Sequence, residues 1–280
     1  MSTTMTISAA DVNKLRQQTG AGMMDCKKAL TEANGDFEAA IDYLRKKGAK
    51  VAANRSDRDA KEGYIIAKTN DDATQGYLIA LNCETDFVAK NADFTKFAND
   101  VLDAAIKNNA TTVDAIKDMA FEGVTVADKL LDMVGKIGEK IEVSRFENVN
   151  APRVIVYNHP GNRLAAIVGL NVATVSNVDE IGKNVAMQIA AMSPVAIDKD
   201  DVDAKTLERE IEIGKEQARA EGKPENMIEK IAMGKLNKFY QENTLLNQSY
   251  IKEDKLSVRQ YLTEIDKNLT VTAFKRVQLG

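Results

Sequence analysis

One ten-residue stretch places an acid and a large aromatic where packing alone would favour small polar turn residues. The run Asn82-Cys83-Glu84-Thr85-Asp86-Phe87-Val88-Ala89-Lys90-Asn91 joins an apolar, strand-like segment to an amphipathic, helix-like one. An aromatic side chain held out on such a corner is suited to anchor a protein–protein interface, where buried aromatics contribute about 2 kcal/mol or more. Alternatively, Asp86 caps the following turn and Phe87 folds back onto the helix of Phe94. The residues alone leave both interpretations open.

The chain offers few of the patterns used in catalysis or ligand binding. Its single histidine, His159, stands beside Pro160 and Gly161, and Cys26 and Cys83 lack the CxxC spacing of a zinc site. The sequence contains no GxxxxGK[ST] phosphate-binding loop and no GxSxG nucleophile motif. We therefore expect no metal site, no cofactor, no direct nucleotide binding and no enzyme activity. Both cysteines are expected to be small buried side chains.

Composition narrows the class of protein further. The 280 residues carry a net charge of −4 at pH 7, whereas a DNA-binding protein usually has a basic excess that neutralises phosphates. No run of about 18 apolar residues predicts a membrane span, and the N-terminus lacks a signal pattern. We expect a cytoplasmic protein that binds neither DNA nor membranes. The length suits about two domains.

The positions before the acid–aromatic run predict a separate helical module. Ser8 and Asp36 are suited to cap helices, Gly20-Ala21-Gly22 and Asn34-Gly35 interrupt them, and Gly48 is expected to end the third. Three helices of this size are typical of ubiquitin-associated modules. The predicted module covers residues 1–50, and a polar linker covers 51–62.

Beyond residue 63 the pattern changes to hairpins. Strand-like segments at 64–69 and 77–82 flank a polar loop, and a helix-like segment follows them. The same order returns at 153–157 and 164–170, again before a helix. The chain therefore contains two related hairpin-plus-helix subdomains, at residues 63–149 and 150–280.

The two copies align at a constant offset of 89 residues. Leu170-Asn171-Val172-Ala173-Thr174 matches Leu81-Asn82-Cys83-Glu84-Thr85, and 170 minus 81 is 89. At this offset Asp86 and Phe87 correspond to Val175 and Ser176. Only the first copy therefore has the acid–aromatic pair.

The second subdomain carries an insertion. Two helix-like segments over about 200–242 meet at Gly222-Lys223-Pro224 and predict a helical hairpin. A short helix at 257–265 and a strand at 270–279 follow, and the strand should return to the second sheet. The predicted fold class is α+β: a three-helix module, two hairpin-plus-helix subdomains with small antiparallel sheets, and an inserted helical hairpin.

Two runs carry a resemblance to a known family. Thr19-Gly20-Ala21-Gly22-Met23-Met24-Asp25-Cys26-Lys27-Lys28-Ala29-Leu30 and the acid–aromatic run resemble bacterial elongation factor Ts, the nucleotide-exchange factor for the GTPase elongation factor Tu. The resemblance covers about residues 5–279. It implies that Thr85, Asp86, Phe87 and Val88 enter the GTPase near its magnesium site, which promotes GDP release so that GTP can bind.

The resemblance also implies further contacts with elongation factor Tu, in its GDP-bound and nucleotide-free forms. These involve Met23 and Met24 in the helical module, Ile137 and Gly138, and His159 at the tip of the second hairpin. On the residues alone, packing at a helix start also explains the methionines, and an ordinary turn histidine explains His159. A homodimer or a two-plus-two complex through the helical hairpin is a further arrangement that the family allows.

A function of another class also fits the sequence. The chain would be a non-catalytic adaptor whose N-terminal module binds a peptide or a helix, with the remainder as scaffold. This hypothesis predicts that Phe87→Ala leaves function intact and that changes around Met23 and Met24 abolish it.

Overall fold

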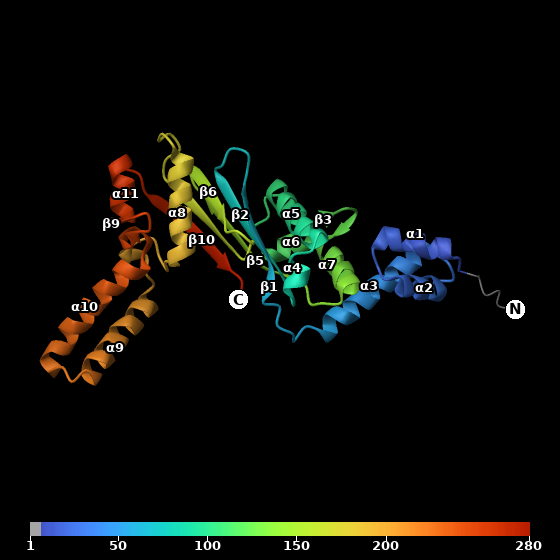
Figure 1. Cartoon of the computed structure of the whole chain (residues 1–280), viewed down its shortest axis with the longest axis horizontal. Coiled ribbons are helices and arrows are strands. Elements are labelled where there is room, and N and C mark those ends of the chain that lie inside the picture. Colours follow the sequence, from blue (N-terminus) through green and yellow to red (C-terminus); the bar gives the residue numbers. More distant parts are fainter. Residues whose placement is uncertain (1–6) are drawn as a thin grey trace. The chain divides into compact units, whose positions relative to one another are not determined.

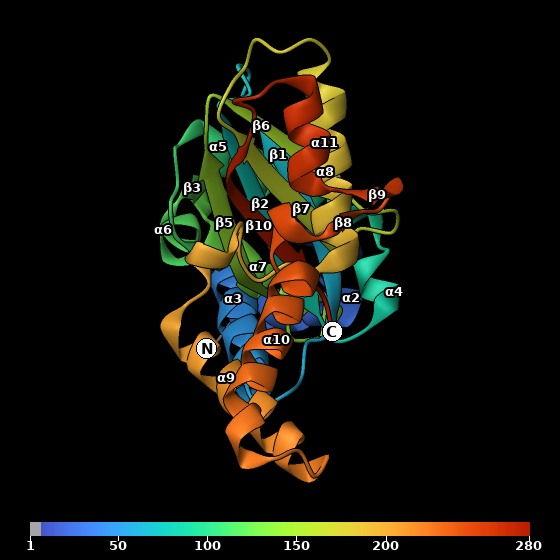
Figure 2. The ribbon, with the colours of Figure 1, turned by 90° about the vertical axis from the view of Figure 1, so that its left-hand side faces the viewer.

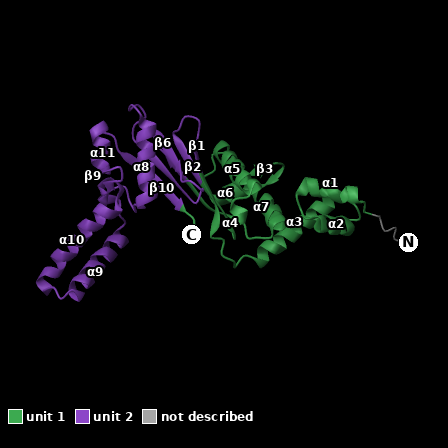
Figure 3. Ribbon diagram, viewed as in Figure 1, with its two compact units in different colours: residues 1–66, 79–147, 278–280 green, residues 67–78, 148–277 purple. Residues whose placement is uncertain are grey.

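A computed structural model describes residues 7–280 of the chain (Figure 1). The predicted α+β class is confirmed. Two compact units emerge (Figure 3): unit 1 holds the described residues up to 66 together with 79–147 and 278–280, and unit 2 holds 67–78 and 148–277. The predicted subdomain boundary between residues 149 and 150 lies close to the unit boundary between 147 and 148, and the helical module is grouped within unit 1.

The chain starts with the three expected helices, α1 (Ala9–Thr19), α2 (Met23–Glu32) and α3 (Phe37–Asn54). Ser8 and Asp36 accept backbone N–H groups at the starts of α1 and α3, and these bonds satisfy donors that a helix end leaves free. Side chains from all three helices form a small core, made of Val12, Leu15, Cys26, Ala29, Leu30 and Ala40. The prediction of a buried Cys26 is confirmed.

The prediction that the third helix ends at Gly48 was wrong, because α3 continues to Asn54. A Cβ atom at Gly48 would lie 2.4 Å from the carbonyl oxygen of Leu131 in α7 (Val126–Ile137), and one at Gly135 would lie 3.2 Å from the Gly48 Cα. Glycine weakens a helix interior by about 1 kcal/mol relative to alanine. Here it permits a close crossing of two helices, so it serves packing and not termination.

Two three-stranded sheets have the same topology. In each, a hairpin's second strand is central and a later strand pairs with it, in the orders β1-β2-β5 and β6-β7-β10. The strands are β1 (Glu62–Thr69), β2 (Gln75–Cys83), β5 (Glu142–Asn150), β6 (Arg153–Asn158), β7 (Leu164–Leu170) and β10 (Val271–Gln278). The predicted return of the last strand to the second sheet is confirmed, and the internal repeat extends to the third strand.

A helix follows each hairpin, as the repeat predicts. After β2 the chain forms α4 (Asp86–Ala89) and α5 (Ala92–Lys107), and after β7 it forms α8 (Val178–Met192). The buried face of α5 consists of Phe94, Phe97, Ala98, Val101, Leu102 and Ala105. Three further short elements, α6 (Val113–Asp118), β3 (Ala120–Phe121) and β4 (Val124–Thr125), lead into α7.

In unit 2 the inserted helical hairpin consists of α9 (Ala204–Ala220) and α10 (Glu225–Asn243), which lie side by side (Figures 1 and 2). Gly214 of α9 sits against Ala232 of α10. The remaining elements of the insertion and its return are η1 (Lys199–Asp201), η2 (Leu245–Asn247), β8 (Ser249–Tyr250), β9 (Glu253–Ser257) and α11 (Val258–Ile265). The core of this unit joins α8 and α11 to the sheet of β6, β7 and β10.

A search of residues 7–280 for a helix with the length and apolar character of a membrane span finds none.

Candidate functional site

The acid–aromatic corner is a single helical turn held between two caps. The Thr85 hydroxyl accepts the Val88 N–H at 3.5 Å at the start of α4, and the Asn91 side chain accepts the Asp93 N–H at 2.8 Å at the start of α5. Helical residues two apart point to opposite sides. Because Ala89 is buried, Phe87 points outward and 83% of its surface is exposed. Phe87 therefore does not fold back onto α5.

The second copy of the repeat has no such turn. Residues 171–177 between β7 and α8 contain no helix, and α8 starts at Val178 after an N-cap residue, Asn177, that makes no side-chain capping bond. Single exposed apolar side chains are common on protein surfaces. The exposed aromatic on a capped turn, present in one copy of a repeat and replaced by a plain connection in the other, is what marks the corner as a candidate binding site.

Asp86 remains near the surface beside Phe87. The Lys90 ammonium donates to its carboxylate at 2.7 Å, one helical turn away. This hydrogen bond from Lys90 lowers the pKa of Asp86 below its usual value. The corner therefore presents an ionised acid and an apolar ring next to each other.

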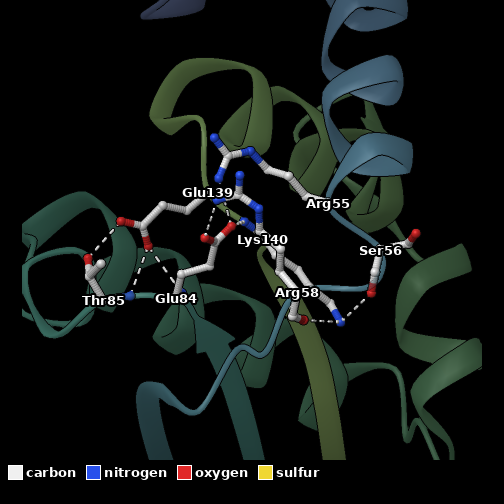
Figure 4. A network of polar contacts seen from close by, with 7 residues as sticks. All are labelled: Arg55, Ser56, Arg58, Glu84, Thr85, Glu139 and Lys140. Atoms are coloured by element: carbon white, nitrogen blue, oxygen red, sulfur yellow. Dashed lines mark hydrogen bonds and ion pairs between the residues drawn. The ribbon is translucent and has the colours of Figure 1, made fainter.

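Two loops far apart in sequence hold the corner by reciprocal hydrogen bonds (Figure 4). The Glu139 carboxylate accepts the backbone N–H groups of Glu84 and Thr85 at 3.1 and 3.0 Å, and the Thr85 hydroxyl at 2.7 Å. In return, the Glu84 carboxylate accepts the Lys140 N–H at 2.6 Å. Glu84 belongs to the acid–aromatic run and Glu139 directly follows Gly138. The sequence assigns neither residue a role, because only the fold brings them together.

Two arginines from the segment after α3 complete this network. Arg55 and Arg58 donate to the Glu84 carboxylate at 2.8 and 3.0 Å. Desolvation favours the neutral acid, but the bonds from the Lys140 N–H and the two guanidinium groups outweigh it and lower the pKa of Glu84 to about 2. Glu84 is therefore ionised at neutral pH.

Cys83 precedes the corner and is inert. Its side chain is fully buried, and its thiol donates to the Thr85 carbonyl at 3.1 Å. Burial raises the pKa of Cys83 to about 12, which keeps the thiol protonated and unreactive at neutral pH. The expectation of a buried Cys83 is confirmed.

Ile137 and Gly138 lie beside the corner, because they immediately precede Glu139. Ile137 is the last residue of α7, and Gly138 ends the helix with φ of +78° while its N–H bonds the Val134 carbonyl at 2.8 Å. This left-handed conformation favours glycine. The structure thus joins two of the sequence-predicted contact regions through one network.

Met23 and Met24 start α2 and are exposed over 54% and 75% of their surfaces. Neither side chain belongs to the core of the helical module. Exposed methionines are adaptable contact residues, and they lie in the same unit as the corner.

His159 lies in unit 2, in the loop between β6 and β7, and is exposed. Its Nδ1 atom is 3.0 Å from the Tyr157 hydroxyl, and its ring packs edge-on against the Tyr157 ring. The loop closes through the bond from the His159 N–H to the Leu164 carbonyl at 2.9 Å. This is a well-defined tip, and no residue of the corner belongs to its unit.

A cavity of about 620 Å³ lies in unit 1 among α3, α5 and α7. Its charged lining is mutually neutralised by the pairs Lys47–Asp25, Arg45–Asp132, Lys136–Asp93, Lys96–Asp100 and Lys129–Glu122. Among residues 7–280, no group of three or more His, Cys, Asp or Glu side chains is arranged to hold a metal ion. Neither observation adds a ligand site to the corner.

Comparison with known proteins identifies the family. The family model described as Elongation factor TS matches residues 84–280. Elongation factor Ts of Christiangramia forsetii is 53% identical over 98% of this chain and 99% of its own length. The proteins of the same name from Amoebophilus asiaticus and Flavobacterium psychrophilum are 52% and 53% identical, over 99% and 98% of this chain and 100% and 99% of their own lengths. This chain belongs to the elongation factor Ts family.

Proposed function

We propose that this chain is a guanine-nucleotide exchange factor for elongation factor Tu and works in the cytoplasm. It acts by protein–protein binding and carries out no bond-making chemistry. The observation that carries the proposal is the projecting Phe87 on a turn that two caps and the Glu139 carboxylate hold in place, in a chain that belongs to the elongation factor Ts family.

In the proposed mechanism the corner enters the GTP-binding domain of elongation factor Tu. Phe87 supplies an apolar wedge that gains favourable burial only in the complex. Asp86 brings a negative charge beside it, and Thr85 and Val88 flank the pair. The wedge disturbs the partner's magnesium and phosphate site, so GDP leaves and GTP takes its place.

Thermodynamic linkage sets what the contacts must achieve. If the chain binds nucleotide-free elongation factor Tu more tightly than the GDP-bound form, it weakens GDP binding by the same factor. Each tenfold factor needs about 1.4 kcal/mol of differential binding. Exchange over several decades therefore needs several anchors. Met23, Met24, Ile137, Gly138 and His159 are the proposed additional contacts.

The first test measures release of a fluorescent GDP analogue from elongation factor Tu by stopped flow. The wild-type chain should accelerate release, and Phe87→Ala should lower the acceleration roughly 30-fold, which corresponds to about 2 kcal/mol. Ile265→Ala removes an exposed apolar side chain at the end of α11 and is the matched control. This control should release GDP as fast as wild type.

Each other outcome has a definite meaning. Acceleration that survives Phe87→Ala keeps the exchange function and discards the corner as its site. If the wild-type chain produces no acceleration, the exchange function is overturned. Loss of partner binding on Met23→Ala or Met24→Ala would then favour the adaptor, whose peptide- or helix-binding surface is the N-terminal module.

A further inference from the structure

We propose that Glu139 is the positioning residue of the corner: its carboxylate fixes the turn that presents Asp86 and Phe87. The proposal rests on the proposed exchange function. It starts from the three hydrogen bonds that Glu139 accepts from Glu84 and Thr85 across a separation of more than fifty residues.

The charge of Glu139 determines which groups in the network donate hydrogen bonds and which accept them. An ionised carboxylate only accepts hydrogen bonds, so the Thr85 hydroxyl must be the donor of the hydrogen bond to Glu139. The lone pairs of that hydroxyl then remain available to the Val88 N–H, which is the cap of α4. Glu139 therefore orients the cap hydroxyl, and the cap holds the turn on which Phe87 stands.

The reciprocal bond from the Lys140 N–H to Glu84 makes the arrangement a clamp (Figure 4). Each loop supplies a carboxylate to the backbone of the other. Lys140 also donates through its ammonium group to the carbonyls of Ser56 and Arg58 at 3.0 and 3.2 Å. The loop of Ile137 and Gly138 is consequently fixed to the loop of Thr85, and two proposed contact regions form one body.

Preorganisation of the corner should strengthen binding to nucleotide-free elongation factor Tu more than binding to the GDP-bound form. A corner that moves freely is in its binding form only part of the time, which weakens the apparent affinity by that fraction. The loss falls on the nucleotide-free complex, in which the wedge is inserted, more than on the encounter with the GDP-bound form. The informative quantity is therefore the dissociation constant for GDP-bound elongation factor Tu divided by the dissociation constant for the nucleotide-free form. A partly unfolded sample lowers the active fraction in both measurements and leaves this ratio unchanged.

The experiment titrates labelled elongation factor Tu, GDP-bound and nucleotide-free, with the wild-type chain, Glu139→Ala and Glu139→Gln. Glu139→Ala should reduce the ratio about tenfold, which is about 1.4 kcal/mol. Glu139→Gln should recover part of that loss, because an amide oxygen still accepts the two backbone N–H groups but the hydroxyl loses its carboxylate acceptor. Thr85→Val, which removes the cap hydroxyl, tests the same relay if Glu139→Ala fails to fold.

The matched control is Asp128→Asn. Asp128 accepts the Thr125 N–H and hydroxyl at 3.1 and 2.8 Å in the capping box of α7. The substitution therefore weakens the same kinds of hydrogen bond as a change at Glu139, in the helix that precedes Glu139. It should lower thermal stability and leave the ratio unchanged. In a Phe87→Ala background, Glu139→Gln should change the ratio by a smaller factor than in the wild-type background, because part of the effect of Glu139 is exerted through Phe87.

The two levels of the proposal fail in different ways. If the wild-type chain binds both forms of elongation factor Tu equally, the exchange function itself is wrong. If the wild-type ratio is large and Glu139→Ala or Thr85→Val preserves it, the positioning role is wrong and the exchange function stands. A reduction of equal size in Asp128→Asn would assign the effect to stability alone and would also overturn the positioning role.

Discussion

At the scale of single residues, Glu84 has the most strongly shifted pKa among the carboxyl groups near the corner. Three donors reach its carboxylate, from the Lys140 backbone, Arg55 and Arg58, while only 15% of its side chain is exposed. Removing one partner of such a group leaves a buried charge without compensation. Glu84 therefore links the stability of the corner to pH.

The pKa of Glu84 predicts the direction of this linkage. Folding lowers the pKa from an ordinary 4.5 to about 2, so the stabilisation is complete above pH 4.5 and is lost as the pH falls toward 2. The full difference corresponds to about 3 kcal/mol, and the exposure of Arg58 reduces our expectation to about 2 kcal/mol. Wild type should exceed Glu84→Gln in stability at pH 7, and the gap should narrow by that amount below pH 4.5.

Urea denaturation of both proteins between pH 2 and 7 measures this gap. Other carboxylates titrate in the same range, but they are common to both chains, so the difference isolates position 84. A gap that stays constant with pH would show that the Glu84 carboxylate is not held by its donors in solution.

At the scale of elements, helix caps and hairpin loops were predicted from the sequence, whereas the role of Gly48 was not. Ser8 and Asp36 cap helices as their types predict, and both hairpins lie where polar loops separate apolar runs. The prediction at Gly48 failed because a glycine that stops a helix and one that admits a neighbouring helix look alike in sequence. The difference lies in α7, about eighty residues further along the chain, whose approach local pattern does not reveal.

The crossing of α3 and α7 predicts a large difference between two glycine-to-alanine changes. Gly48→Ala places a Cβ 2.4 Å from the Leu131 carbonyl oxygen, and overpacking of this kind costs about 1–3 kcal/mol. Gly234 is also inside a helix, but no neighbouring atom lies within 4 Å of the position that a Cβ would occupy there. Gly234→Ala should therefore stabilise its helix by about 0.5–1 kcal/mol.

Thermal and urea unfolding of the two variants give the comparison. Gly135→Ala, whose Cβ would be 3.2 Å from the Gly48 Cα, should fall between them. If Gly48→Ala proved as harmless as Gly234→Ala, the close helix crossing would not be the arrangement in solution.

At the scale of the whole molecule, the repeat explains how much of the fold was predictable. Each copy is a hairpin, a helix and a returning strand, and the offset of 89 residues aligned the first hairpin with the second. The candidate site was predictable only in part. The run around Phe87 and the pair Met23-Met24 are each a continuous stretch that can be recognised in the sequence. The bonds that join Glu84 to Glu139 and Lys140 form only when distant parts of the chain fold together.

The helical hairpin of α9 and α10 is a self-contained insertion in unit 2. The chain entering it and the chain leaving it are hydrogen-bonded to each other: the Val195 N–H bonds the Asn243 carbonyl at 2.8 Å, and the Leu245 N–H bonds the Ala196 carbonyl at 2.9 Å. Packed helices lie about 8–10 Å apart. Replacing residues 204–242 by a Gly-Ser linker of about four residues, which keeps Asn243, should therefore close the chain without strain.

We expect the shortened chain to keep the sheet of β6, β7 and β10 and to unfold cooperatively, with the rest of unit 2 within about 1 kcal/mol of its original stability. The core of α8 and α11 on this sheet lies outside the removed segment, and so do Phe87 and the other proposed contacts, so acceleration of GDP release should persist. Circular dichroism and urea unfolding test the fold, and sedimentation of both chains tests whether the hairpin mediates self-association. Loss of cooperative unfolding would contradict this prediction. It would mean that the core of α8, α11 and the sheet depends on the helical hairpin, although no residue of the hairpin belongs to that core.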